Sequence, residues 1–85
     1  MIDPMKNLNR FMETYERELT IAVQAYPDEY AYPADTVPEV AGRMRAAIER
    51  GTFNHDGRGF RNTCRALGIK HTRRAIAEFL AGGAE

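Results

Sequence analysis

Apolar residues recur at steps of three and four along most of this chain, which is the period of one face of an α-helix. The clearest stripe runs from Leu8 to Tyr26, with charged residues such as Glu13 and Arg17 on the opposite face. Pro27 follows the stripe and ends it, because proline cannot donate a backbone hydrogen bond. The pattern predicts a first helix of about 30 Å, long for a chain of 85 residues.

Three shorter helices are expected after it, and no segment shows the alternation that is typical of a strand. The chain is therefore predicted to be a single all-α domain over residues 1–85, with helices at 5–26, 37–50, 55–67 and 72–81. The last two helices are expected to form a helix-turn-helix around Gly68, and the second helix is expected to complete a tri-helical core with them. The long first helix would brace this core or form a homodimer through apolar surface at Met5, Leu8 and Met12.

Residues that favour helix ends support these boundaries. Gly51 and Gly68 are expected to end the second and third helices in the left-handed conformation. Thr36 and Glu39 form the pattern of a capping box. The other expected capping residues are Asp3 or Asn7 for the first helix, Asn54 or Asp56 for the third, and Thr72 for the fourth.

Two Tyr-Pro steps bracket residues 26–35, which are predicted to form an ordered loop with a short helical turn. The loop carries Tyr26, Tyr30 and Tyr32. These three side chains either form a surface that contacts a partner or cover the edge of the core with their hydroxyl groups in water.

The net charge is zero, but the two halves of the chain differ. Residues 1–42 carry a net charge of −5, and residues 43–85 carry a net charge of +5. Such asymmetry favours binding to nucleic acid or to an acidic partner. The alternative is that the two halves neutralise each other within the fold.

The basic residues gather near the expected helix pair. Arg58, Arg61 and Arg65 lie at i, i+3 and i+7, so they share one helical face. Ala66-Leu67-Gly68-Ile69 resembles the turn of helix-turn-helix regulators, although this chain has Arg74 where that family has an early aliphatic residue of the second helix. The resemblance implies DNA binding. The expected nucleic-acid contacts are Arg58, Arg61, Arg65, Lys70, His71, Thr72, Arg73 and Arg74.

A looser resemblance covers residues 44–51 and 64–72, which are similar to small uncharacterised proteins of temperate phages. It implies a different function, that of a phage accessory protein that binds and modulates a host protein without catalysis. The tyrosine loop or the basic face would then contact the partner.

The remaining residues exclude several kinds of site. One cysteine, Cys64, permits no intrachain disulfide and no cysteine-based zinc cage, and favours a cytoplasmic location. Cys64 lies on the apolar stripe of its helix, so we expect a core residue rather than a reactive thiol. His55 and His71 do not match a metal-binding spacing, so we expect no metal and no cofactor.

No catalytic motif is present, so we do not expect an enzyme. No apolar run is long enough to span a membrane, and the first residues lack the pattern of a signal peptide. A second methionine, Met5, is the start that we expect for the native chain, with residues 1–4 preceding it.

Overall fold

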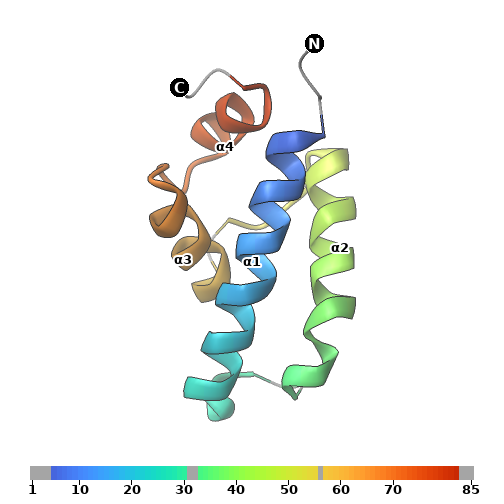
Figure 1. The fold of residues 1–85 in the computed structure, drawn as a ribbon, viewed down its shortest axis with the longest axis vertical. Helices are drawn as coiled ribbons and strands as arrows, with labels where there is room; N and C mark the ends of the chain where they lie inside the picture. Colours follow the sequence, from blue (N-terminus) through green and yellow to red (C-terminus); the bar gives the residue numbers. More distant parts are fainter. Residues whose placement is uncertain (1–4, 31–32, 56, 83–85) are drawn as a thin grey trace.

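The computed structural model describes residues 5–30, 33–55 and 57–82. The helices are α1 (Lys6–Ala25), α2 (Val37–Arg50), α3 (Arg58–Leu67) and α4 (Arg73–Leu80), and two short 3₁₀ turns, η1 (Pro27–Glu29) and η2 (Ala34–Thr36), connect α1 to α2 (Figure 1). No strand occurs among the described residues. The predicted all-α fold with four helices is confirmed, and the largest difference in boundaries is at α3, which begins at Arg58 rather than at residue 55.

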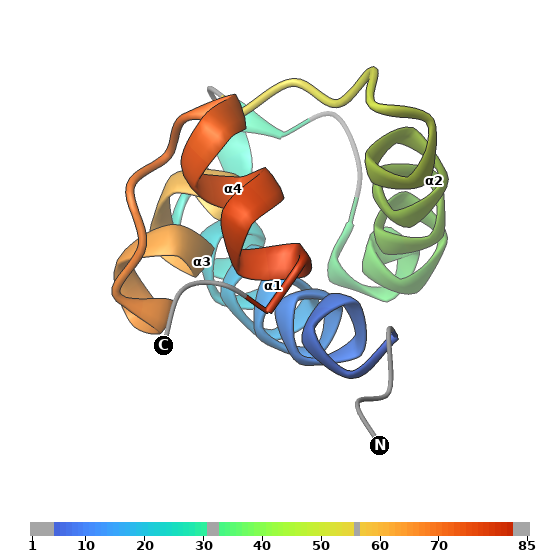
Figure 2. The same ribbon diagram turned by 90° about the horizontal axis from the view of Figure 1, so that it is seen from above.

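Helix α1 is the centre of the fold. Helices α2 and α3 lie on opposite sides of it, and α4 crosses near its N-terminal end (Figures 1 and 2). The expected tri-helical core of α2, α3 and α4 is not confirmed, since in the described part of the chain the backbones of these helices approach α1 rather than one another, and their buried side chains join those of α1 in one cluster. The reason is that α1 has the longest apolar stripe, and each shorter helix buries its own stripe against it.

Aromatic rings join α1 to the C-terminal half. The ring of Phe11 is fully buried, with its centroid 5.2 Å from that of Phe60 in α3 and 6.4 Å from that of Phe79 in α4. Phe53, in the connection between α2 and α3, stacks on Phe60 at 5.6 Å. Cys64 is also buried, as expected from its position on the stripe. This cluster fixes which face of α3 points inward, and therefore which face points to solvent.

Helix α3 lies close to α1 at Gly59. A Cβ atom at this position would lie 3.0 Å from Cδ1 of Leu19 and 3.4 Å from its Cα. Leu19 is itself buried, so the missing side chain of Gly59 allows the two helices to pack closely. The weak helix propensity of glycine is offset here by this contact.

Three of the expected helix ends are confirmed. Gly51 and Gly68 adopt the left-handed conformation, with φ of 75° and 73°. Thr72 caps α4, because its hydroxyl oxygen accepts a hydrogen bond from the backbone N–H of Ala75 at 3.1 Å.

Other expected caps are wrong. The side chain of Thr36 forms no capping hydrogen bond, because η2 runs directly into α2 and leaves Thr36 with helical φ and ψ; a capping side chain needs extended backbone geometry. Asn7 lies inside α1, and its Nδ2 donates to the backbone oxygen of Phe79 at 2.8 Å. Helix α3 starts after Gly57 without a side-chain cap, so Asn54 does not cap it. Asp3 and Asp56 lie outside the described residues.

The first helix does not expose the apolar strip that was expected for a homodimer. Leu8 and Met12 are both buried within the chain, and only Met5 of the three expected residues is exposed. None of the helices in the described ranges combines the length and apolar character needed to cross a lipid bilayer.

Candidate nucleic-acid interface

The outward side of α3 carries four polar side chains within one helical face: Arg58, Arg61, Asn62 and Arg65, which together form the α3 basic face. With Glu29 of η1 and Tyr30, they line an open depression of about 530 Å³. The helical spacing predicted from the sequence therefore places Arg58, Arg61 and Arg65 on one surface. The aromatic cluster on the inner side of α3 holds this surface toward solvent.

Arg58 is held in place by two residues from the acidic half of the chain. Its Nε and Nη2 each donate to a carboxylate oxygen of Glu29 at 3.0 Å. Its Cζ lies 4.1 Å from the centroid of the Tyr26 ring, within the range of a cation–π contact. The hydrogen bonds to Glu29 raise the pKa of the Arg58 guanidinium above its ordinary value. The positive charge of Arg58 is therefore balanced locally, and the two contacts favour this position of its side chain.

Arg61 and Arg65 differ from Arg58, because neither pairs with a carboxylate among the described residues. Both are exposed. They lie one turn apart, about 6 Å along the helix axis. With Arg58 balanced by Glu29, these two guanidinium groups give the depression a net positive charge and ten uncommitted N–H donors.

Two arginines of α4 are directed into contacts within the chain. Nη1 of Arg73 donates to the backbone oxygen of Gly51 at 3.1 Å, and its Cζ lies 5.1 Å from the centroid of the Phe53 ring. Nε of Arg74 pairs with Glu78 at 3.3 Å, one turn along the same helix. The hydroxyl of Thr72 accepts the capping hydrogen bond. Arg73 and Arg74 thus each have a partner within the chain, although both side chains remain exposed.

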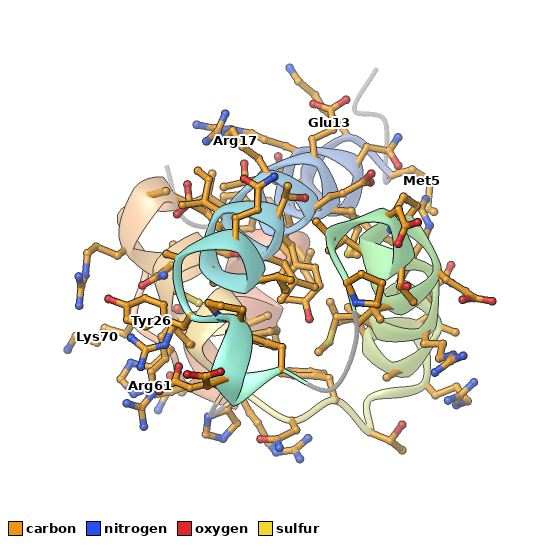
Figure 3. The ribbon with its side chains drawn as sticks, turned by 90° about the horizontal axis from the view of Figure 1, so that it is seen from below. Met5, Glu13, Arg17, Tyr26, Arg61 and Lys70 are labelled. Atoms are coloured by element: carbon orange, nitrogen blue, oxygen red, sulfur yellow. The ribbon has the colours of Figure 1, made fainter. Side chains whose placement is uncertain are left out.

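Lys70 and His71 lie in the turn between α3 and α4, and both are exposed. The ring of His71 is 6.5 Å from that of His55 in the preceding connection. Figure 3 shows Arg61, Lys70 and Tyr26 projecting from the α3 side of the molecule, whereas Glu13 and Arg17 project from α1. Lys70 therefore extends the positive charge of the α3 side beyond the depression.

The sequence left open whether the loop tyrosines form a contact surface or cover the edge of the core, and the described tyrosines differ in this respect. Tyr26 is 47% exposed and lies beneath Arg58. Tyr30 is half-buried, packs against the core and also lines the depression. Tyr32 lies outside the described residues. Tyr26 is thus a surface residue next to the α3 basic face, while Tyr30 both covers the core edge and borders the site.

Two residues of this site were missed by sequence reasoning. Asn62 lies four positions after Arg58, so helical spacing alone could have placed it on the same face. Glu29 could not have been found in this way, because it lies on a different element and reaches Arg58 only through the fold.

Within the described residues, one ion pair joins the acidic and basic halves of the chain. Among the ion pairs of the described residues, Arg58–Glu29 joins the two halves, whereas Arg17–Glu18 and Arg74–Glu78 each lie within one half. A second shallow depression, of about 430 Å³, lies along α1 and includes Glu13, Glu16 and Arg17. Its carboxylates make it unsuitable for an anion, so the two depressions differ in the charge of the ligand that each would accept.

No group of histidine, cysteine and acidic side chains in the described ranges is arranged to hold a metal ion. Burial raises the pKa of the Cys64 thiol to about 11, so this side chain is protonated and unreactive at neutral pH.

Comparison of the chain with protein-family models, with curated proteins and with solved structures finds no match.

Proposed function

We propose that this protein binds nucleic acid through the α3 basic face, with Arg61 and Arg65 contacting phosphate groups and Lys70 extending the contact. The observation that carries the proposal is the pair of exposed, unpaired guanidinium groups in an open depression with polar walls. Guanidinium groups bind phosphate oxygens with two parallel hydrogen bonds, which suits them to this ligand.

This mode of binding differs from that of a helix-turn-helix regulator. In such a protein the second helix of the pair lies in the major groove and presents side chains to the bases. Here Arg73 contacts Gly51 and Phe53, and Arg74 contacts Glu78, so both arginines of α4 would share or leave an internal partner in order to contact a base. Helix α3 is therefore the proposed contact element, and contacts to the phosphate backbone carry the binding.

The test is a fluorescence titration of labelled nucleic acid at several salt concentrations. Three phosphate contacts, from Arg61, Arg65 and Lys70, predict a slope of log K against log salt of about −2 for a single strand and about −3 for a duplex. A slope near −5 would show that Arg58, Arg73 and Arg74 also leave their internal partners and contact phosphate. Absence of binding at low salt and micromolar protein would overturn the proposal.

A second candidate function is binding to an acidic surface of another protein. It is favoured by the arrangement of Tyr26 and Tyr30 beside the arginines of α3, since tyrosine and arginine are enriched at the energetic centres of protein interfaces. The resemblance to phage proteins would make that partner a host protein. Affinity capture from a bacterial lysate separates the two functions, because a nucleic-acid binder loses its captured material after nuclease treatment and a protein binder retains one defined partner.

A further inference from the structure

Arg58 differs from the other cations of the α3 basic face in how its guanidinium group is used. Nε and Nη2, on one edge of the planar group, both donate to Glu29. Its Cζ lies over the ring of Tyr26, 4.1 Å from the ring centroid. The side chain nevertheless remains 42% exposed and lines the depression. Arg58 therefore offers a ligand the side of its guanidinium group opposite the Tyr26 ring, together with the three N–H groups of Nη1 and Nη2 that Glu29 does not use.

Glu29 already balances the charge of Arg58, so Arg58 is a weaker phosphate ligand than Arg61 or Arg65, but its plane can still serve as a platform for a nucleic-acid base. Bases that are not paired stack on aromatic rings and on guanidinium planes, and such stacking tolerates any base. The Tyr26 ring beneath Arg58 and the carboxylate of Glu29 beside it favour one orientation of the plane, which reduces the conformational freedom lost when a base stacks on it.

We propose that the ligand of this site is single-stranded nucleic acid, with one unpaired base stacked on the open face of Arg58 while Arg61 and Arg65 bind the adjoining phosphates. This inference rests on the proposed function and specifies the class of nucleic acid. The depression, at about 530 Å³, lies within the range of pockets that hold small organic ligands, roughly 300–1,000 Å³. The amide of Asn62 lies in the same wall and can bond the edge of the base.

A base in a duplex cannot reach this platform, because both of its faces are covered by neighbouring bases. Affinity would then have two separable contributions, one from phosphate binding and one from base stacking. Arg61, Arg65 and Lys70 interact with any polyanion, whereas the plane of Arg58 distinguishes a strand with free bases from one without them.

The experiment compares two labelled single strands of equal length, about ten nucleotides, by fluorescence anisotropy at one low salt concentration. One strand is oligothymidylate, whose bases stack weakly on each other, and the other is an abasic strand with the same phosphate charge. We expect the protein to bind oligothymidylate roughly tenfold more tightly, the lower part of the range for stacking of one base. A duplex of equal length should gain no affinity from stacking on Arg58, because its bases are paired and stacked on each other.

Charge-conserving variants identify the residue responsible. Arg58→Lys keeps the charge but removes the plane, so it should bind the two strands with equal affinity. Arg61→Lys should weaken both strands to the same extent and keep their ratio. Arg17→Lys, on α1, is the matched control and should behave as the native protein. Circular dichroism spectra should show that each variant remains folded.

The outcomes separate the inference from the proposed function. Equal affinity of the native protein for the two strands, with salt-dependent binding retained, overturns the stacking role of Arg58 and leaves the phosphate contacts standing. A preference for oligothymidylate that persists in Arg58→Lys also overturns it. No binding of either strand at low salt overturns both proposals.

Discussion

Thr36 and Thr72 both immediately precede a helix, yet only one of them caps it. Thr72 follows a turn and has extended φ and ψ, so its hydroxyl can accept the hydrogen bond from Ala75. Thr36 belongs to η2 and already has helical backbone geometry, and its side chain forms no capping hydrogen bond to α2. The residue type was predictive at both sites, but the conformation of the preceding residues decided whether a cap forms.

The two threonines give a matched pair of variants. Thr72→Ala should reduce the free energy of unfolding by about 1 kcal/mol, the usual cost of losing an N-cap hydrogen bond. Thr36→Ala should change it by less than about 0.5 kcal/mol, because no such bond is lost. Urea denaturation followed by circular dichroism measures both values. Equal losses in the two variants would contradict this account of the caps.

The thiol of Cys64 predicts a loss of stability at high pH. In the unfolded chain the thiol ionises near its ordinary pKa of 9.0, but in the fold burial raises the pKa to about 11. The unfolded state therefore loses its proton first, and the free energy of unfolding falls as the pH rises from about 9 to 11, by up to roughly 2–3 kcal/mol. Urea denaturation of the native protein and of Cys64→Ala across this window isolates the effect, since the other titrating groups are common to both proteins. If the free energy of unfolding depends on pH in the same way in the native protein and in Cys64→Ala, this role of the Cys64 thiol is contradicted.

At the scale of the helices, the sequence predicted which segments are helical but not how they pair. The apolar period located all four helices, and Gly51 and Gly68 marked two of their ends. An apolar stripe, however, can pack against any other stripe, so the pattern did not show that α2, α3 and α4 each bury theirs on α1. The close approach at Gly59 was equally hidden, because it depends on the position of Leu19 in another helix.

The contact between α1 and α3 predicts opposite effects of alanine at two glycines. At Gly42, in the exposed side of α2, a Cβ atom meets nothing within 4 Å, so Gly42→Ala should stabilise the protein by roughly 0.5–1 kcal/mol through helix propensity. At Gly59 the same change forces the buried side chain of Leu19 to move. Gly59→Ala should therefore destabilise the protein by about 1 kcal/mol despite the gain in propensity.

Thermal or urea denaturation of the two single variants tests this account of the interface. Stabilisation of both proteins to the same extent would show that α3 does not depend on a close contact with α1 at this position.

At the scale of the whole molecule, the fold accounts for its apolar residues within one chain. Leu8 and Met12 are buried in the core, and the large apolar side chains that remain exposed in the described ranges are Met5, Ile21 and Tyr26. Stable interfaces usually bury about 800 Å² on each partner, which these separate residues do not provide. We therefore expect light scattering to give a mass near 9.6 kDa. A species of twice that mass at micromolar concentration would contradict this expectation.

At the candidate site, too, the sequence predicted which residues share a helical face but not which distant residues they contact. Helical spacing predicted that Arg58, Arg61 and Arg65 share a face, and the fold exposes that face. The sequence did not show that Glu29 and Tyr26 hold Arg58, or that Arg73 contacts Gly51 and Phe53, because these partners are distant along the chain. The fold thus separates nine cations of one half of the sequence into those with internal partners and those available to a ligand.

The most direct measurement of the central claim compares two double variants that remove the same charge from different faces. Arg61→Ala with Arg65→Ala removes the unpaired cations of α3, and Arg43→Ala with Arg50→Ala removes two exposed arginines of α2. Titrated with labelled oligothymidylate at low salt, the α3 variant should lose at least about tenfold in affinity, the equivalent of one charge-assisted hydrogen bond. The α2 variant should stay within about twofold of the native protein. Equal losses in both variants, or no loss in the α3 variant, would contradict a binding site on α3.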